Sequence, residues 1–171
     1  MVFARAWPPR SASVLNISDP IEQLRAAIAV TRGPTPWRVV TQDDIDSFAQ
    51  ITHDTQWIHV DVERAKRESP FGTTIAHGNL TLSIIDGLRE QLSPRKGLEQ
   101  VKLGVNMGWN RVRFPAPVPA GGRVRATAEL ASVEDKGGGW WEVVDRFAIE
   151  LEGGAKPVCV AESVGRLLLA P

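Results

Sequence analysis

The sequence predicts an α+β domain in which an antiparallel sheet wraps around one long central helix. Apolar residues recur at helical spacing in the first half of the chain, and the stretch from about Gly78 to Leu92 is apolar on more than one helical stripe. Residues 101–169 instead alternate apolar and polar side chains between glycine-rich connections. A long sheet whose concave face is filled by one buried helix accounts for these observations.

Bulk composition restricts the class of protein. A chain of 171 residues forms one domain, and we divide it into an N-terminal extension with a short helix (residues 1–35) and a single domain (residues 36–171). Twenty basic residues balance twenty acidic ones, which argues against nucleic acid as a partner. The only cysteine is Cys159, in a strand-like segment, where we expect a buried, inert thiol. No signal peptide or membrane-spanning segment is evident, so we expect a cytoplasmic protein with no membrane partner.

The first expected helix begins at Pro20, with Asp19 as its N-cap, because Ile21, Leu24 and Ile28 form one apolar stripe. A short strand is expected at 37–40.

A second helix should begin after Thr41, a favoured N-cap residue. Its predicted apolar face consists of Ile45, Phe48 and Ile51. The segment from residue 52 to 74 is expected to be irregular apart from a helical turn at 62–66. Beyond the central helix, strands are expected at 101–107, 109–114, 123–133, 140–150 and 158–169.

All three histidines, His53, His59 and His77, lie within 25 positions of one another. Asp54 follows the second helix, and His59 comes five residues later in the irregular segment, where catalytic groups are often found. A carboxylate and an imidazole that flank a water molecule can add it across a double bond. An Asp-x4-His spacing alone is weak evidence, because most such pairs are structural.

The start of the central helix is the second candidate feature. His77 and Gly78 occur where backbone N–H groups lack intrahelical acceptors, and glycine admits a ligand oxygen closely. These are the requirements of an oxyanion hole for a thioester carbonyl. Taken alone, a helix that starts with glycine and binds no ligand is the commoner outcome.

Together, the segments 51–65 (Ile-Thr-His-Asp-Thr-Gln-Trp-Ile-His-Val-Asp-Val-Glu-Arg-Ala) and 70–78 (Pro-Phe-Gly-Thr-Thr-Ile-Ala-His-Gly) resemble the hydratase motif of the MaoC-like (R)-specific enoyl-CoA hydratases. The segment 110–121 (Asn-Arg-Val-Arg-Phe-Pro-Ala-Pro-Val-Pro-Ala-Gly) is similar to that family's strand–turn signature. The resemblance covers residues 37–169 and is closest to the short 3-hydroxyacyl-thioester dehydratases.

The resemblance implies a hot-dog fold, a homodimer and an enzyme that reversibly hydrates trans-2-enoyl thioesters to (R)-3-hydroxyacyl thioesters. It assigns the catalytic dyad to Asp54 and His59, and the oxyanion hole to Gly78. Gln56, His77 and Ser83 are candidate supporting residues. No metal or cofactor is expected, and the acyl group would arrive on coenzyme A or acyl carrier protein.

The chain departs from the family pattern at two places. His53 replaces the usual glycine before the aspartate, and could pair with Asp54, alter its pKa or face solvent; Gln56-Trp57 replaces the usual Asn-Pro. Two other functions stay open at this point: an acyl-thioester hydrolase on the same fold, and a non-catalytic acyl-binding dimer. Weaker candidates for coenzyme A phosphates are Arg95, Lys96, Arg111 and Arg113.

Overall fold

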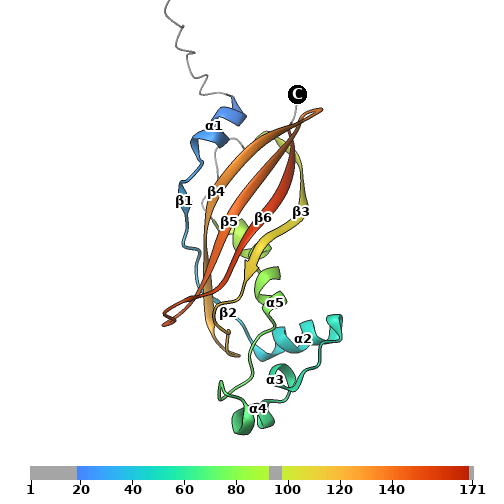
Figure 1. Cartoon of the computed structure of the whole chain (residues 1–171), viewed down its shortest axis with the longest axis vertical. Coiled ribbons are helices and arrows are strands. Elements are labelled where there is room, and N and C mark those ends of the chain that lie inside the picture. Colours follow the sequence, from blue (N-terminus) through green and yellow to red (C-terminus); the bar gives the residue numbers. More distant parts are fainter. Residues whose placement is uncertain (1–18, 93–97, 170–171) are drawn as a thin grey trace, which may run out of the picture.

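The computed structural model describes residues 19–92 and 98–169 of the chain. The predicted phosphate candidates Arg95 and Lys96 lie outside these residues. Long antiparallel strands curve around a pair of consecutive helices, and three further helices gather at one end of the sheet (Figure 1).

The sheet has the strand order β1-β4-β5-β6-β3, with β2 also pairing with β4. Its long strands are β3 (Val101–Arg113), β4 (Arg123–Gly137), β5 (Trp140–Leu151) and β6 (Pro157–Leu169), and the short ones are β1 (Thr31–Arg32) and β2 (Arg38–Val39). The predicted antiparallel sheet is therefore confirmed, with hairpins joining β4 to β5 and β5 to β6, while β3 pairs with β6. The two strands predicted at 101–107 and 109–114 form one strand, because a register shift between Asn106 and Gly108 bends β3 without ending it.

The central helix runs as α5 (Gly78–Ser83) followed by α6 (Ile85–Glu90), rather than as one uninterrupted helix to Leu92. The break at Ile84 is slight, since the N–H of Ile84 still donates to the carbonyl of Leu80 and the N–H of Leu88 to that of Ile84. Two consecutive β-branched residues, Ile84 and Ile85, crowd the backbone at this point. Ile85 and Leu88 are fully buried against the concave face of the sheet, which forms the core.

Helix α1 (Pro20–Ala26) begins as predicted, with the Asp19 side chain accepting a hydrogen bond from the N–H of Ile21. Thr41 caps α2 (Gln42–Thr52), and a reciprocal bond from its own N–H to Asp44 completes a capping box. The domain boundary at residue 35 stays a prediction, although β1 already pairs with β4.

The prediction for the apolar face of α2 is wrong at Ile51, whose side chain is 80% exposed. Six residues advance a helix by about 240°, so Ile51 points away from Ile45. Ala49 is buried instead.

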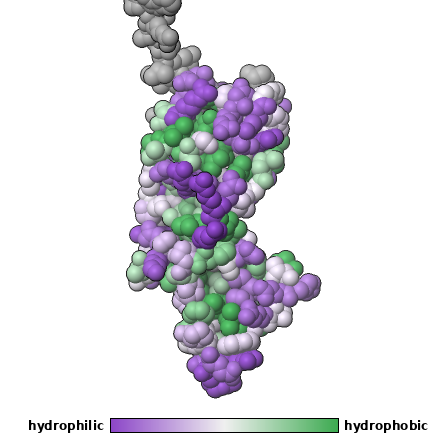
Figure 2. Space-filling model, viewed as in Figure 1, coloured by the Kyte–Doolittle hydropathy of each residue, from purple (hydrophilic) through white to green (hydrophobic). Residues whose placement is uncertain are grey.

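The segment predicted to be irregular contains two helices, α3 (Trp57–Val60) and α4 (Val62–Glu68). The expected helical turn at 62–66 corresponds to part of α4, whereas α3 was not predicted. Charged side chains cover the tip of the molecule formed by α4 (Figure 2). None of the helices in the described part of the chain combines the length and the apolar character that crossing a bilayer requires.

Candidate active site

Asp54 and His59 are positioned by the end of α2 and by α3. His53 is the C-cap of α2 and adopts the left-handed conformation (φ 58°, ψ 20°), which turns the chain so that Asp54 leaves the helix. Glycine adopts this conformation without strain, whereas residues with a Cβ do so at some cost. The family's glycine at this position thus has a backbone explanation, and the His53 side chain itself is exposed to solvent.

His59 is buried, and its ring is fixed by a hydrogen bond of 2.7 Å between Nδ1 and the carbonyl oxygen of Ile75. Since a carbonyl can only accept, Nδ1 carries the proton, and Nε2 of the neutral ring keeps its lone pair. The backbone of His59 is held as well, because Gln42 donates to its carbonyl at 2.8 Å while accepting from the hydroxyl of Thr74. This arrangement presents His59 as a base.

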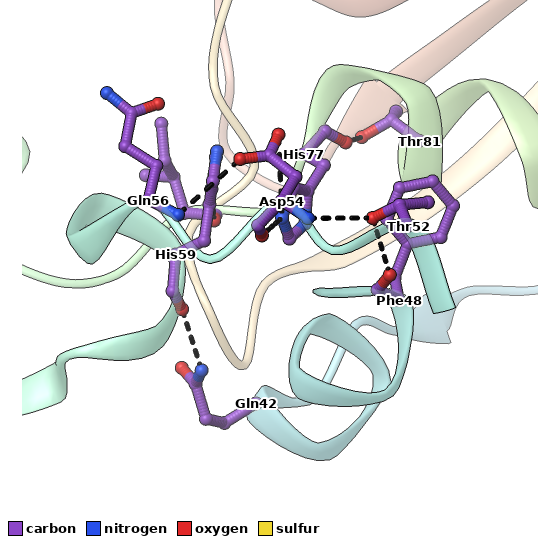
Figure 3. Close-up of polar contacts among 9 residues, drawn as sticks. Gln42, Phe48, Thr52, Asp54, Gln56, His59, His77 and Thr81 are labelled. Atoms are coloured by element: carbon purple, nitrogen blue, oxygen red, sulfur yellow. Dashed lines mark hydrogen bonds and ion pairs between the residues drawn. The ribbon is translucent and has the colours of Figure 1, made fainter. Parts of the chain in front are cut away.

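His77 connects the two members of the predicted dyad. Its Nε2 donates to the backbone carbonyl of Asp54 at 3.0 Å and lies 4.0 Å from the carboxylate of that residue. Its ring stacks on the ring of His59 with centroids 3.8 Å apart. Figure 3 shows Asp54, His59 and His77 converging from three segments of the chain. One side-chain ligand atom from each lies within 4.8 Å of the others.

Such a set could also be considered as a metal site. However, the two imidazole rings are stacked with only 27° between their planes. Nδ1 of His59 and Nε2 of His77 are also already bonded to the backbone carbonyls of Ile75 and Asp54, so each ring has one nitrogen left for a metal. Acid–base chemistry fits the three residues better.

A cavity of about 320 Å³ opens between the dyad region and the start of α5. His59, Gly78, Thr81 and Phe114 line it. Gly78 has no room for a side chain, because a Cβ would lie 2.8 Å from the ring of Phe114. The first N–H groups of α5 lack intrahelical acceptors. The cavity thus combines the imidazole of His59 with backbone donors at a helix start. Asp54 does not line the cavity; its half-exposed carboxylate lies within 4.8 Å of ring nitrogens of His59 and His77.

The predicted strand–turn segment also belongs to this site. The carbonyl of Val118 accepts from the N–H of Ala76, and the N–H of Ala120 donates to the carbonyl of Thr74. These two bonds hold the turn after β3 against the residues that precede His77. Phe114 and Val118 thereby become walls of the cavity.

The remaining predicted site residues lie farther from the chemistry. The backbone N–H of Gln56 is 3.5 Å from the Asp54 carboxylate, but its side-chain amide points away (Figure 3). The hydroxyl of Ser83 donates to the carbonyl of Asn79, and the side chain is exposed. Arg111 pairs with Glu162 on β6.

Three contributors were missed from the sequence: Gln42, Thr81 and Phe114. Thr81 is buried, lines the cavity and donates to the carbonyl of His77. It lies one helical turn after His77, which is the sequence spacing that could have indicated it.

Comparison with known proteins agrees with this geometry. A family model described as "MaoC like domain" matches residues 24–144. The chain is 49% identical, over 86% of its length and 95% of the relative's, to 3-hydroxyacyl-thioester dehydratase Z of Mycobacterium tuberculosis.

Two solved structures share the architecture. One is a monoamine oxidase regulatory protein from Archaeoglobus, with a TM-score of 0.68, 29% identity and coverage of 84% of this chain and 92% of that one. The other is the (R)-hydratase from A. caviae, with a TM-score of 0.61, 22% identity and coverage of 81% and 94%. The predicted hot-dog fold is confirmed.

Proposed function

Because the chain belongs to the MaoC-like domain family, we propose that Asp54 and His59 are the acid–base pair with which it reversibly hydrates trans-2-enoyl thioesters. The activity is that of a hydratase or dehydratase, a carbon–oxygen lyase, as in the related 3-hydroxyacyl-thioester dehydratase. One observation supports the residue assignment most: His59, whose Nδ1 bonds to the carbonyl of Ile75, and the helix start at Gly78 belong to one cavity.

In the proposed reaction the thioester carbonyl accepts hydrogen bonds from N–H groups at the start of α5. This polarises the conjugated double bond and stabilises the enolate that forms as oxygen adds to the β-carbon. The dyad enters the reaction with one proton: its unprotonated member takes a proton from the attacking water, its protonated member delivers its proton to the α-carbon, and proton transfer between the two restores the starting state. Both new bonds form on the face of the enoyl group that meets the dyad, so the addition is syn, and we propose the (R)-3-hydroxyacyl thioester as its product. Since only proton transfers are needed, the proposal includes no metal or cofactor.

His77, Thr81 and Gln42 serve the dyad indirectly. His77 holds the backbone of Asp54 and stacks on His59, Thr81 bonds to the carbonyl of His77, and Gln42 bonds to that of His59. Fixing the two reacting groups in this way limits the geometric freedom that would otherwise slow the reaction.

The reaction type is tested with crotonyl-CoA. Hydration removes the absorbance of the conjugated double bond and yields (R)-3-hydroxybutyryl-CoA, while no thiol is released. If free coenzyme A accumulates while the double bond persists, the protein is a thioester hydrolase and the proposal is wrong. If neither product forms, a non-catalytic acyl-binding role is favoured. Repeating the assay with the acyl-carrier-protein thioester determines which carrier the enzyme uses.

We also propose a homodimer that forms through β3. In the part of the chain that the structure describes, β3 pairs only with β6, so its other edge has no partner strand. Leu103, Val105 and Met107 on this strand are 40–50% exposed, and hydrophobic surface is visible over the sheet between charged side chains (Figure 2). A long apolar edge favours pairing with a second copy. Light scattering at micromolar concentration should give twice the chain mass, and a monomer would contradict this proposal.

A further inference from the structure

A second cavity, of about 500 Å³, lies between α6 and the concave face of the sheet. Gly104 on β3 and Gly165 on β6 form part of its wall. Neither glycine has a positive φ, and a Cβ at either would have no neighbour closer than 3.6 Å. The backbone therefore does not require glycine at these positions. The missing side chains instead leave the hollow opposite α6 open.

The cavity is mostly apolar but carries a guanidinium in its wall. Arg89, on the last turn of α6, donates from Nη2 to the hydroxyl of Ser163 at 2.6 Å, and its guanidinium lies over the ring of Phe147. Ser163 is 2% exposed. The Nε of Arg89 is buried, and no acceptor for it exists among the described residues. Nε itself has no surface open to the cavity, but about a third of the Arg89 side chain is exposed and Arg89 lines the cavity, so the rest of the guanidinium can donate to a ligand oxygen there.

The carboxylates around the cavity restrict the kind of oxygen. Asp145 and Glu90 belong to its wall, with Asp145 buried 3.8 Å from Arg32, while Asp86, outside the lining, lies 3.7 Å from Arg89. These carboxylates already offset the positive charge of the guanidinium groups. A neutral acceptor therefore fits better than another carboxylate, which would be repelled.

The position of the cavity relative to the dyad links it to the substrate. Gly78 begins α5, and Arg89 follows along the same pair of helices after eleven residues, a rise of about 16 Å. Both cavities lie against this helix pair. An acyl group with its thioester at Gly78 that extends along the helices would bring its tail to Arg89, provided that it is much longer than a butyryl group.

On the basis of the proposed hydratase function, we propose that this cavity binds the acyl tail and selects thioesters whose tail bears a hydroxyl or oxo oxygen. Such an oxygen accepts a hydrogen bond from the Arg89 guanidinium. A plain hydrocarbon tail would remove water from the exposed part of the Arg89 guanidinium without offering an acceptor, which lowers the turnover of plain substrates.

The test compares two trans-2-enoyl-CoA substrates of the same length, long enough to reach Arg89, that end in either a methyl or a hydroxyl group. The kcat/KM of each is divided by that of crotonyl-CoA for the same variant, which corrects for losses at the dyad or in folding. Wild type should prefer the hydroxylated tail by about tenfold or more. Arg89→Leu should abolish or invert the preference, and Arg89→Lys should keep part of it.

Two further variants serve as controls. Gly165→Leu fills the cavity and should reduce turnover of both long substrates relative to crotonyl-CoA. Arg64→Leu removes a guanidinium on α4, outside the cavity lining, and should leave the preference as in wild type.

Three results would overturn the inference: equal turnover of the two long substrates, turnover of neither, or a preference that survives Arg89→Leu. In each case, hydration of crotonyl-CoA would still support the hydratase function. A folded wild type that hydrates none of the substrates would refute both.

Discussion

Replacing Gly78 with alanine should separate catalysis from folding at the start of α5. The new methyl group would lie 2.8 Å from Cδ2 and Cε2 of Phe114, well inside the optimal carbon–carbon separation of about 3.5–4.0 Å. The ring of Phe114 is 42% exposed and can move outward. Overpacking costs about 1–3 kcal/mol, and the higher helix propensity of alanine returns up to about 1 kcal/mol. The free energy of unfolding should fall by about 0–3 kcal/mol.

Activity should fall much further. If the thioester oxygen approaches the helix N–H groups at Gly78 as proposed, the methyl group would obstruct it, and loss of one oxyanion donor lowers kcat by about 10²–10³-fold. Crotonyl-CoA hydration and urea unfolding measure the two effects separately. Phe114→Ala removes the ring with which the methyl group clashes. In that background Gly78→Ala should therefore no longer lower the free energy of unfolding, but the double variant should remain nearly inactive. Wild-type activity in folded Gly78→Ala, or recovered activity in the double variant, would refute the reasoning.

Two substitutions near the site and one labelling experiment on the sheet give further tests. His53→Gly should raise the free energy of unfolding by up to about 1 kcal/mol in urea titrations, because glycine adopts the left-handed conformation freely. Activity should not fall, and a loss of activity would mean that the imidazole of His53 participates in the reaction. Gln42→Leu should cost about 1–3 kcal/mol in the same titrations and lower kcat, because the carbonyl of His59 and the hydroxyl of Thr74 lose their partner; unchanged stability and rate would contradict its positioning role. Burial raises the pKa of the Cys159 thiol to about 11. At pH 8 the protonated thiol should therefore resist iodoacetamide in the native protein and react only after denaturation. Rapid labelling of the native protein would show that β6 opens.

The parts of the fold that sequence reasoning predicted well are those with a local cause. Thr41 caps α2 and Asp19 caps α1 through their own side chains, and the alternation along β4, β5 and β6 follows directly from a half-buried sheet. α3 was missed because it has four residues and no side-chain cap at Gln56. Without a cap or a long apolar stripe, such a turn is determined by tertiary contacts.

In the candidate site, too, features with a local cause could be predicted and those that depend on tertiary contacts could not. The cluster of histidines and the glycine at the helix start could be recognised from the sequence, and the structure brings Asp54, His59 and His77 together. The contribution of Gln42 could not be predicted, because it reaches His59 and Thr74 across 17 and 32 positions of the chain. The conformation of His53 was also hidden: only the backbone angle explains why glycine is usual there.

The most direct test of the central claim is a double-mutant cycle on the dyad. Asp54→Asn, His59→Gln and the double variant are compared with wild type in crotonyl-CoA hydration, with folding checked by circular dichroism. Groups that act as a unit in proton transfer are strongly non-additive. We predict that each single variant loses about 10²–10⁴-fold in kcat and that the double variant is no worse than the poorer single one. A folded single variant that retains near-wild-type kcat would contradict the assignment of Asp54 and His59 as the catalytic pair.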